Sequence, residues 1–459
     1  MITIIQGYIV IAIFVLLLVR FKYGIALYLA YLMLVPYMKI NLFGITLQWN
    51  FVNLFVFLVT IIHIKTKYPK YKLNWEPLIP FVLYFLVSLI IIPLQFGTPY
   101  LDQLNAWRFT MMQCMILPFA IWNTMRVDNS SVQLFRIVMI FCIFTIVGYG
   151  LFLTTMPGIN PYITIMALAN GEEFNEAYAL AENGGRLFGR ISSVFTHPMS
   201  FGLFIGFATV FLFFNKTRMH ITIFTFLLVL LAVDSVVCGV RSCIGGLFCA
   251  LIGWMVMSGN YIELIRGRGV KYMLVSIVLL SIIIPIISQV PELESYFKSM
   301  TLSQSDDIRG SSIETRINQL WGCFVEIQDS FVFGKGFNWT GFYVAEKEFH
   351  PTILCFESLI FVVLCNSGLV GVLLWFFMLL KISKYNKRYG IYNWAYLNTL
   401  LVFYLSYATI TGEYGYMQYY ILFYILMLGE TISSKKESKI LYGVVKMNHK
   451  ETSCRVFHD

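Results

Sequence analysis

The segment Ile2–Val19, ITIIQGYIVIAIFVLLLV, is an unbroken apolar run without one charged side chain. A membrane-spanning helix needs about 20 consecutive apolar residues, so this segment alone predicts a span. It has neither a basic start nor a small-residue cleavage site. We therefore expect a retained helix rather than a removable signal peptide.

Further apolar stretches, each bounded by charged or turn residues, follow along the 459 residues. They lie near residues 24–38, 47–64, 77–95, 107–125, 132–153, 191–214, 221–238, 242–257, 271–290, 353–380, 392–410 and 415–432. The sequence therefore predicts an all-α, polytopic integral membrane protein with 12–14 transmembrane helices. We find no internal repeat and no soluble segment of domain size, so residues 1–459 are expected to form a single polytopic membrane domain.

The composition excludes two broad classes of protein. Hydrophobic residues make up 58% of the chain and charged residues only 12%. Soluble domains carry about 25% charged residues, so a soluble globular enzyme is excluded. The 41 Phe, 28 Tyr and 9 Trp exclude a disordered chain. The net charge of +9 does not indicate nucleic acid, because basic residues of membrane proteins gather in cytoplasmic loops.

The basic residues predict the orientation of the chain. Lys65, Lys67, Lys70 and Lys72 form a dense basic loop, and placing it in the cytoplasm fixes every other loop by alternation. This arrangement puts about 23 of the 33 basic residues inside, as the positive-inside rule requires. It places the amino terminus outside and the carboxyl terminus inside.

Two long loops, residues 154–190 and residues 291–350, fall on the predicted outer side. Loops of this length are uncommon unless they are functional. The second is expected to be partly helical, because Ser311-x-x-Glu314 is a capping-box pattern followed by apolar residues at helical spacing. These are Ile313, Ile317, Leu320, Trp321 and Phe324. The pattern predicts an amphipathic helix of about 16 residues, and Gly334-Lys335-Gly336 is a turn that ends the unit.

Three arginines stand at predicted outer ends of spans or on the loop helix: Arg190, Arg241 and Arg316. Arginine is always charged and forks bidentately onto phosphate oxygens, so together they could bind a pyrophosphate. The alternative is that each extends to lipid head groups at the interface. Arg241 favours the first interpretation, because its tight apolar turn offers no other reason for a charge.

His350 is the candidate proton acceptor. Pro351 follows it and suits the first position of a helix, where the helix dipole would keep the imidazole neutral. Glu357, seven residues on, could orient the imidazole or contact a sugar hydroxyl. We expect His197 to cap or kink a span, and Asp234 to be a buried partner for one of the arginines. The alternative for His350 is an ordinary residue at the membrane boundary.

Other chemistries lack their signatures. The sequence contains no P-loop, no dinucleotide fingerprint, no HExxH and no GxSxG. Its nine cysteines show neither a disulfide framework nor a zinc pattern. Nothing resembles the paired Asp residues with which many membrane glycosyltransferases bind a metal. We therefore expect no cofactor and a metal-independent mechanism.

These motifs, in their order and spacing, resemble those of bacterial O-antigen polymerases of the Wzy type and of O-antigen ligases. The quoted pieces are the turn 239–246 (GVRSCIGG), residues 190–195 (RISSVF), Glu314-Thr315-Arg316 with Trp321, residues 333–336 (FGKG), His350, Glu357 and residues 366–371 (NSGLVG). The resemblance covers roughly residues 186–381. Val240 stands where the family often has Ser, and Ser242 where Gly is usual.

The resemblance implies a glycosyltransferase at the periplasmic face of the bacterial inner membrane, using an undecaprenyl-pyrophosphate-linked oligosaccharide. Arg241 and Arg316 would bind the pyrophosphate, His350 would accept the proton of the attacking hydroxyl, and the anomeric carbon would invert. Arg190, Glu357 and Trp321 are expected to bind substrate. Membrane lipid and a chain-length regulator protein are candidate partners, and nucleic acid is not expected.

Within this resemblance we favour a polymerase of O-antigen or capsule repeat units, because the motifs drift from the ligase-like pattern. A ligase that transfers the glycan to lipid A core is the alternative. A flippase for lipid-linked oligosaccharides is the second alternative. It would call for polar residues at the membrane midplane or an inverted repeat, and the sequence shows neither plainly.

Overall fold

The computed structural model describes residues 2–35, 39–42, 45–156, 160–169, 191–259, 313–347, 349–390, 393–412 and 417–433. The predicted span near residues 271–290 lies outside this part of the chain, as do Arg190, Ser311, most of the first long loop and residues 291–312 of the second.

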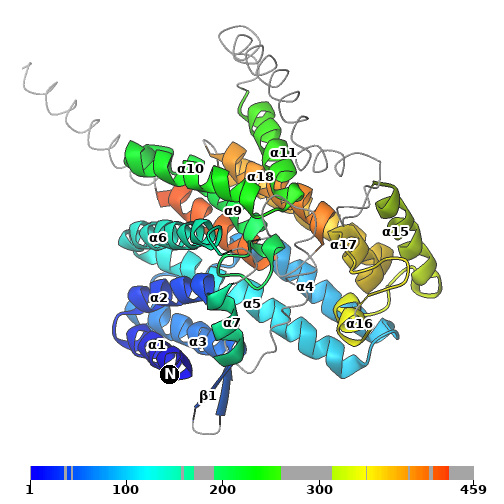
Figure 1. Cartoon of the computed structure of the whole chain (residues 1–459). Helices are drawn as coiled ribbons and strands as arrows, with labels where there is room; N and C mark the ends of the chain where they lie inside the picture. Colours follow the sequence, from blue (N-terminus) through cyan, green and yellow to red (C-terminus); the bar gives the residue numbers. More distant parts are fainter. Residues whose placement is uncertain are drawn as a thin grey trace, which may run out of the picture.

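The first half of the chain is helical, with one short hairpin (Figure 1). Its elements are α1 (Ile2–Val19), α2 (Phe21–Leu34), β1 (Lys39–Leu42), β2 (Ile45–Gln48), α3 (Trp49–Lys67), α4 (Ile79–Ile91), α5 (Tyr100–Val127), α6 (Asn129–Leu153) and α7 (Pro161–Ala169). Single 3-10 turns, Glu76–Leu78 and Ile92–Leu94, flank α4. The antiparallel pair of β1 and β2 is a small departure from the expected all-α fold.

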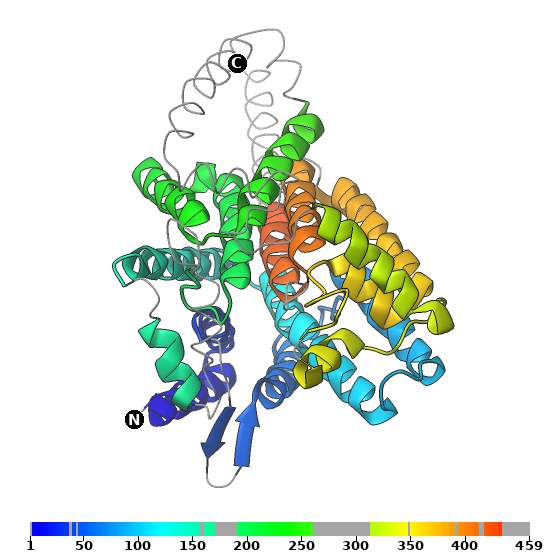
Figure 2. The ribbon, with the colours of Figure 1, turned by 45° about the vertical axis from the view of Figure 1, so that its right-hand side comes forward.

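The second half is also helical. Its elements are α9 (Pro198–Phe214), α10 (Ile221–Val237), α11 (Arg241–Ser258), α15 (Ile313–Glu326), α16 (Trp339–Lys347), α17 (Leu359–Gly390), α18 (Trp394–Thr411) and a helix over residues 417–433. α15 packs against α17, on the side of the molecule away from α1 and α2 (Figure 2). The predicted amphipathic helix in the second long loop is thus present as α15, and α16 is a second helix there that the sequence pattern did not indicate.

Five helical segments of the described chain are long and apolar enough to cross a membrane. They are Trp49–Lys67, Glu76–Leu94, Asn129–Leu153, Arg241–Ser258 and Leu359–Arg388. Shorter apolar helices are Thr3–Val19, Phe21–Leu34, Pro198–Phe214 and Ile221–Val237. The helical character of the apolar stretches is therefore confirmed where the structure describes them, while the count of 12–14 spans stays a prediction.

Two predicted spans begin later than expected. Residues 191–197 form turns, and α9 begins at Pro198, where the ring of His197 accepts a hydrogen bond from the backbone N–H of Met199 (3.1 Å). The expected capping role of His197 is thus confirmed. The span expected from residue 353 is wrong at its start, because residues 351–358 form turns and α17 begins at Leu359.

Aromatic rings fill the space between α9, α11, α18 and the helix over residues 417–433. Phe403 of α18 lies against glycines of two neighbouring helices, Gly206 and Gly246. Tyr404 and Tyr420 are fully buried and stack with their ring centroids 4.9 Å apart. Small residues let the helices approach closely here, as in other helix pairs packed within a membrane.

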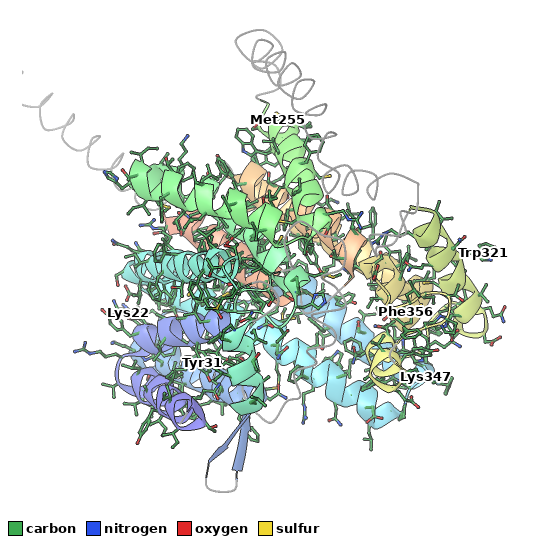
Figure 3. The ribbon with its side chains drawn as sticks, viewed as in Figure 1. Lys22, Tyr31, Met255, Trp321, Lys347 and Phe356 are labelled. Atoms are coloured by element: carbon green, nitrogen blue, oxygen red, sulfur yellow. The ribbon has the colours of Figure 1, made fainter. Side chains whose placement is uncertain are left out.

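Charged contacts join loops that the sequence places in the cytoplasm. Lys22 pairs with Asp128 (Nζ to Oδ2, 3.1 Å) between the starts of α2 and α6. Glu430 is almost fully buried. Its Oε2 accepts a hydrogen bond from Arg218 Nη1 at 2.5 Å and lies 3.6 Å from Arg136 Nη1. Figure 3 shows Lys22 on the opposite side of the molecule from Lys347, which belongs to a predicted outer loop.

A sharp break interrupts α17 at Gly368, whose φ of 60° and ψ of −158° are not helical. The break is filled by residues 331–336, here called the crossing loop. Backbone hydrogen bonds run from Leu369 to Phe331 (3.0 Å), Val370 to Val332 (3.1 Å), Lys335 to Cys365 (2.9 Å) and Gly336 to Asn366 (3.1 Å). Backbone groups freed by a helix break must be paired when water is absent, and the crossing loop pairs these.

Two further features tighten this junction. The side-chain amide of Gln95, directly after the 3-10 turn Ile92–Leu94 that follows α4, donates to the carbonyls of Phe333 (2.5 Å) and Asn366 (2.8 Å). Gly334 and Gly368 cross so closely that a Cβ on either would lie 2.6 Å from the other's backbone nitrogen. The FGKG and NSGLVG motifs therefore lock together, and they fix the ends of α15 and α16 against α17.

Candidate active site around Arg241, Arg316 and Glu357

Arg316 lies in the first turn of α15 and is half-buried. One guanidinium nitrogen donates to the backbone carbonyl of Glu357 (3.0 Å), and another lies 3.7 Å from the Glu357 carboxylate. The amphipathic spacing of α15 turns this side chain toward the 350–358 loop that leads into α17. Arg316 and Glu357, expected separately from the sequence, are thus direct partners.

Arg241 is the first residue of α11 and follows a tight turn in which Gly239 has a φ of 65°. Burial lowers the pKa of Arg316, the Glu357 carboxylate opposes this shift, and the positive charge of Arg241 adds to it. Arg241 therefore lies close enough to Arg316 to act on it electrostatically. Arg316 thus pairs with one carboxylate, and a second guanidinium group from a separate part of the chain acts on it electrostatically.

The loop that carries Glu357 is strained. Leu354 and Phe356 have φ values of 57° and 54°, in the left-handed region that residues other than glycine seldom adopt. The loop also passes close to Gly412, where a Cβ would lie 2.8 Å from the carbonyl oxygen of Phe356. Such backbone strain persists only where the surroundings enforce it, and it concentrates at functional sites. Here it fixes the position of Glu357.

His350 is held in a different way from the one predicted. Its Nδ1 accepts hydrogen bonds from the backbone N–H groups of Thr352 and Ile353, both at 3.1 Å, inside a turn closed by mutual backbone bonds with Leu354. Pro351 is therefore not the first residue of a helix, and the helix-dipole argument for a neutral base at His350 is wrong. With Nδ1 accepting, the neutral ring carries its proton on Nε2.

Glu326 is the partner of that Nε2 proton, and sequence reasoning missed it. Its carboxylate lies 3.3 Å from His350 Nε2 and 3.4 Å from Lys335 Nζ of the crossing loop. Glu326 and Arg316 are ten residues apart on α15, about 15 Å along the helix axis. His350 thus pairs with the carboxyl-terminal end of α15, whereas Arg316 lies in its first turn. No local pattern around Glu326 could have indicated a contact that depends on the 350–354 turn.

The remaining predicted site residues are not part of this cluster. Arg190 lies outside the residues that the structure describes. Trp321 is 71% exposed, at the edge of the molecule (Figure 3). Asp234 is buried, and its carboxylate has no hydrogen-bond partner within the described chain, where its expected arginine partner is not found. Among the described residues, no group of three His, Cys, Asp or Glu side chains could bind a metal ion.

No family model matches the chain, and no curated protein matches it significantly. The resemblance to O-antigen polymerases and ligases therefore rests on the sequence motifs.

Proposed function

We propose that this chain is a metal-independent, inverting glycosyltransferase of the bacterial inner membrane, with 12–14 spans and its site on the periplasmic face. It would polymerise lipid-linked polysaccharide repeat units, of O-antigen or capsule, from an undecaprenyl-pyrophosphate donor. The observation that carries the proposal is the pairing of Arg316 with Glu357, with Arg241 close enough to act electrostatically on Arg316. Two guanidinium groups that interact electrostatically suit a pyrophosphate, the leaving group of this reaction.

The chemistry follows from charge. As the bond from the anomeric carbon to the pyrophosphate breaks, negative charge grows on the bridging oxygen. Fixed guanidinium groups stabilise the transition state, in which this charge develops, more than they stabilise the bound substrate. This difference accelerates transfer. Trp321, exposed on α15, would offer its ring to a sugar face, with Arg190 as a further phosphate contact. A chain-length regulator protein is the expected partner.

His350 takes a positioning role in this proposal. Because Nδ1 is occupied by two backbone N–H groups and Nε2 faces Glu326, the ring supports the turn that precedes Glu357. A ligase acting on lipid A core would use the same donor and the same arginines. The acceptor distinguishes the two enzymes, so the test must report on the product.

The test is complementation of a deletion strain, read on a silver-stained glycan gel. Without a polymerase, a single repeat remains attached and long chains disappear; without a ligase or a flippase, no glycan is attached. We expect Arg241→Ala and Arg316→Ala to lower chain extension by roughly 10²–10³-fold, the usual effect of removing one group that stabilises a developing anion. Arg241→Lys should retain part of the chain extension, because lysine keeps the positive charge but cannot bind phosphate bidentately.

Arg108→Ala is the matched control, since Arg108 is an exposed arginine on α5, a helix that carries none of the proposed site residues. It should leave the ladder of chains unchanged. Full-length polymer from both alanine variants, at normal abundance in the membrane, would show that the arginine pair is not the site.

A further inference from the structure

Resting on the proposed function, we propose that Glu357, not His350, accepts the proton of the attacking hydroxyl, and that the donor's pyrophosphate releases Glu357 for this task by taking its place on Arg316.

The first argument is distance. The carbon under attack is bonded to the pyrophosphate, so the attacking hydroxyl lies beside the phosphate that the arginines bind. A general base must come within about 2.6–3.2 Å of that hydroxyl. The Glu357 carboxylate lies 3.7 Å from the Arg316 guanidinium. Both ring nitrogens of His350 are engaged, Nδ1 by the backbone N–H groups of Thr352 and Ile353 and Nε2 by Glu326, so neither faces that proton.

The second argument is how Arg316 holds its partner. Its hydrogen bond at 3.0 Å goes to the backbone carbonyl of Glu357, whereas its contact with the carboxylate is an ion pair at 3.7 Å. A phosphate oxygen can therefore replace the carboxylate while the backbone bond still anchors the loop. Leu354, Phe356 and Gly412 keep that loop in place during the exchange.

The third argument is charge. The charged groups that face the carboxylate are Arg316 from α15 and, beside Arg316, Arg241 from α11. Without donor, Glu357 offsets the repulsion between the two guanidinium groups. An anionic pyrophosphate in the same position neutralises them and favours the protonated form of a nearby carboxylate. The donor thus creates the proton acceptor that its own reaction needs.

The step balances as follows. The acceptor hydroxyl gives its proton to a Glu357 oxygen while the hydroxyl oxygen bonds to the anomeric carbon. The bond from that carbon to the pyrophosphate breaks, and its electron pair stays on the phosphate oxygen between Arg241 and Arg316. The products are an inverted glycosidic bond, undecaprenyl pyrophosphate and a protonated Glu357, which returns its proton to water.

The experiment measures binding and transfer separately in purified full-length protein. Binding is measured with undecaprenyl pyrophosphate itself, and transfer with a lipid-linked repeat unit in a single turnover. Glu357→Gln should bind the probe as tightly as the wild type or more tightly, because a competing carboxylate is gone. Its transfer rate should fall by about 10²–10⁴-fold, the usual contribution of a general base. Glu346→Gln, an exposed carboxylate on α16, is the control and should behave as the wild type.

Chemical rescue adds a readout that a structural role would not move. Formate should restore part of the transfer rate of Glu357→Ala and should leave the Glu346→Gln rate unchanged. Glu357→Gln that transfers at the wild-type rate, or a 10²-fold loss found in His350→Gln instead, would overturn the proposal. Loss of probe binding in Glu357→Gln would also overturn it, since Glu357 would then be a binding residue. Wild-type protein that neither binds the probe nor transfers would refute the proposed function itself.

Discussion

At the residue scale, Asp128 performs two tasks between α5 and α6. It caps α6 by accepting from the backbone N–H of Ser130 (2.9 Å), and it pairs with Lys22 of α2 (3.1 Å). Partial burial acts to raise the pKa of this carboxyl. The hydrogen bonds from Ser130 and Lys22 outweigh burial and lower the pKa below its usual value. The folded protein therefore favours the charged form.

Because the pKa of Asp128 is lowered by folding, its charge stabilises the protein above the unfolded-state pKa of about 3.9. That contribution is lost as the pH falls through the folded-state value. We expect Asp128→Asn to lower the melting temperature at neutral pH, and the difference from wild type to shrink between about pH 5 and about pH 3. Melting in detergent checks this, and a difference that stays constant over that range would contradict it. Asparagine keeps the cap, so Asp128→Ala should cost about 1 kcal/mol more.

At the element scale, α17 is a helix in two parts joined by the crossing loop. Gly368 has a positive φ and no room for a Cβ, since the atoms it would meet are backbone atoms at 2.6 Å. Backbone cannot move aside as a flexible side chain can. The geometry therefore depends on glycine at this position for two separate reasons.

We expect Gly368→Ala to destabilise the protein by about 1–3 kcal/mol or to prevent its accumulation in the membrane. Gly334→Ala should behave in the same way, because Gly334 also has a positive φ (75°) and its Cβ would also lie 2.6 Å from backbone atoms. The control is Gly148→Ala in α6, where a Cβ would meet nothing within 4 Å. That variant should be neutral or stabilise slightly, as alanine is the better helix former. Equal melting temperatures for the Gly368 and Gly148 variants would show that the crossing is not rigid.

The sequence predicted most of the helices but not the contacts between distant segments that break α17 and form the site. Hydropathy located α1, α3 and α6 within a few residues, because a long apolar run by itself indicates a helix shielded from water. The break in α17 depends on contacts with residues 331–336 and with Gln95, which is more than 200 positions earlier in the sequence. A sequence window around Gly368 does not include these partners, so the break could not be predicted from it. The same limit explains the site: residue type pointed to Arg241 and Arg316, but only the folded chain pairs Arg316 with Glu357 and His350 with Glu326.

At the scale of the whole molecule, the charged contacts separate into two groups. Lys22, Asp128, Arg136, Arg218 and Glu430 pair at one side, and each belongs to a loop or helix end predicted to be cytoplasmic. The contacts of Arg316, Lys335 and His350 lie among predicted outer loops. Pairing of this kind fits the orientation predicted from the basic residues.

This orientation predicts a labelling pattern in intact cells. A cysteine at Lys347, exposed on α16, should react with a membrane-impermeant maleimide, while a cysteine at Lys70 should react only after the cells are opened. The wild-type chain, with its own nine cysteines, gives the background. Labelling of both positions, or of Lys70 alone, in intact cells would reverse or reject the predicted topology.

The crossing loop also constrains how the chain can be made. Residues 331–336 leave the ribosome before the helix whose break they fill, and Gln95 leaves it long before either. In the predicted topology, the loop must therefore wait on the outer side of the bilayer, with exposed backbone groups, until α17 has inserted. Assembly cannot finish span by span in order of synthesis, and partly built chains are expected to be targets of membrane proteases. Variants at this crossing should thus be recognised first by low abundance, before any loss of turnover per molecule.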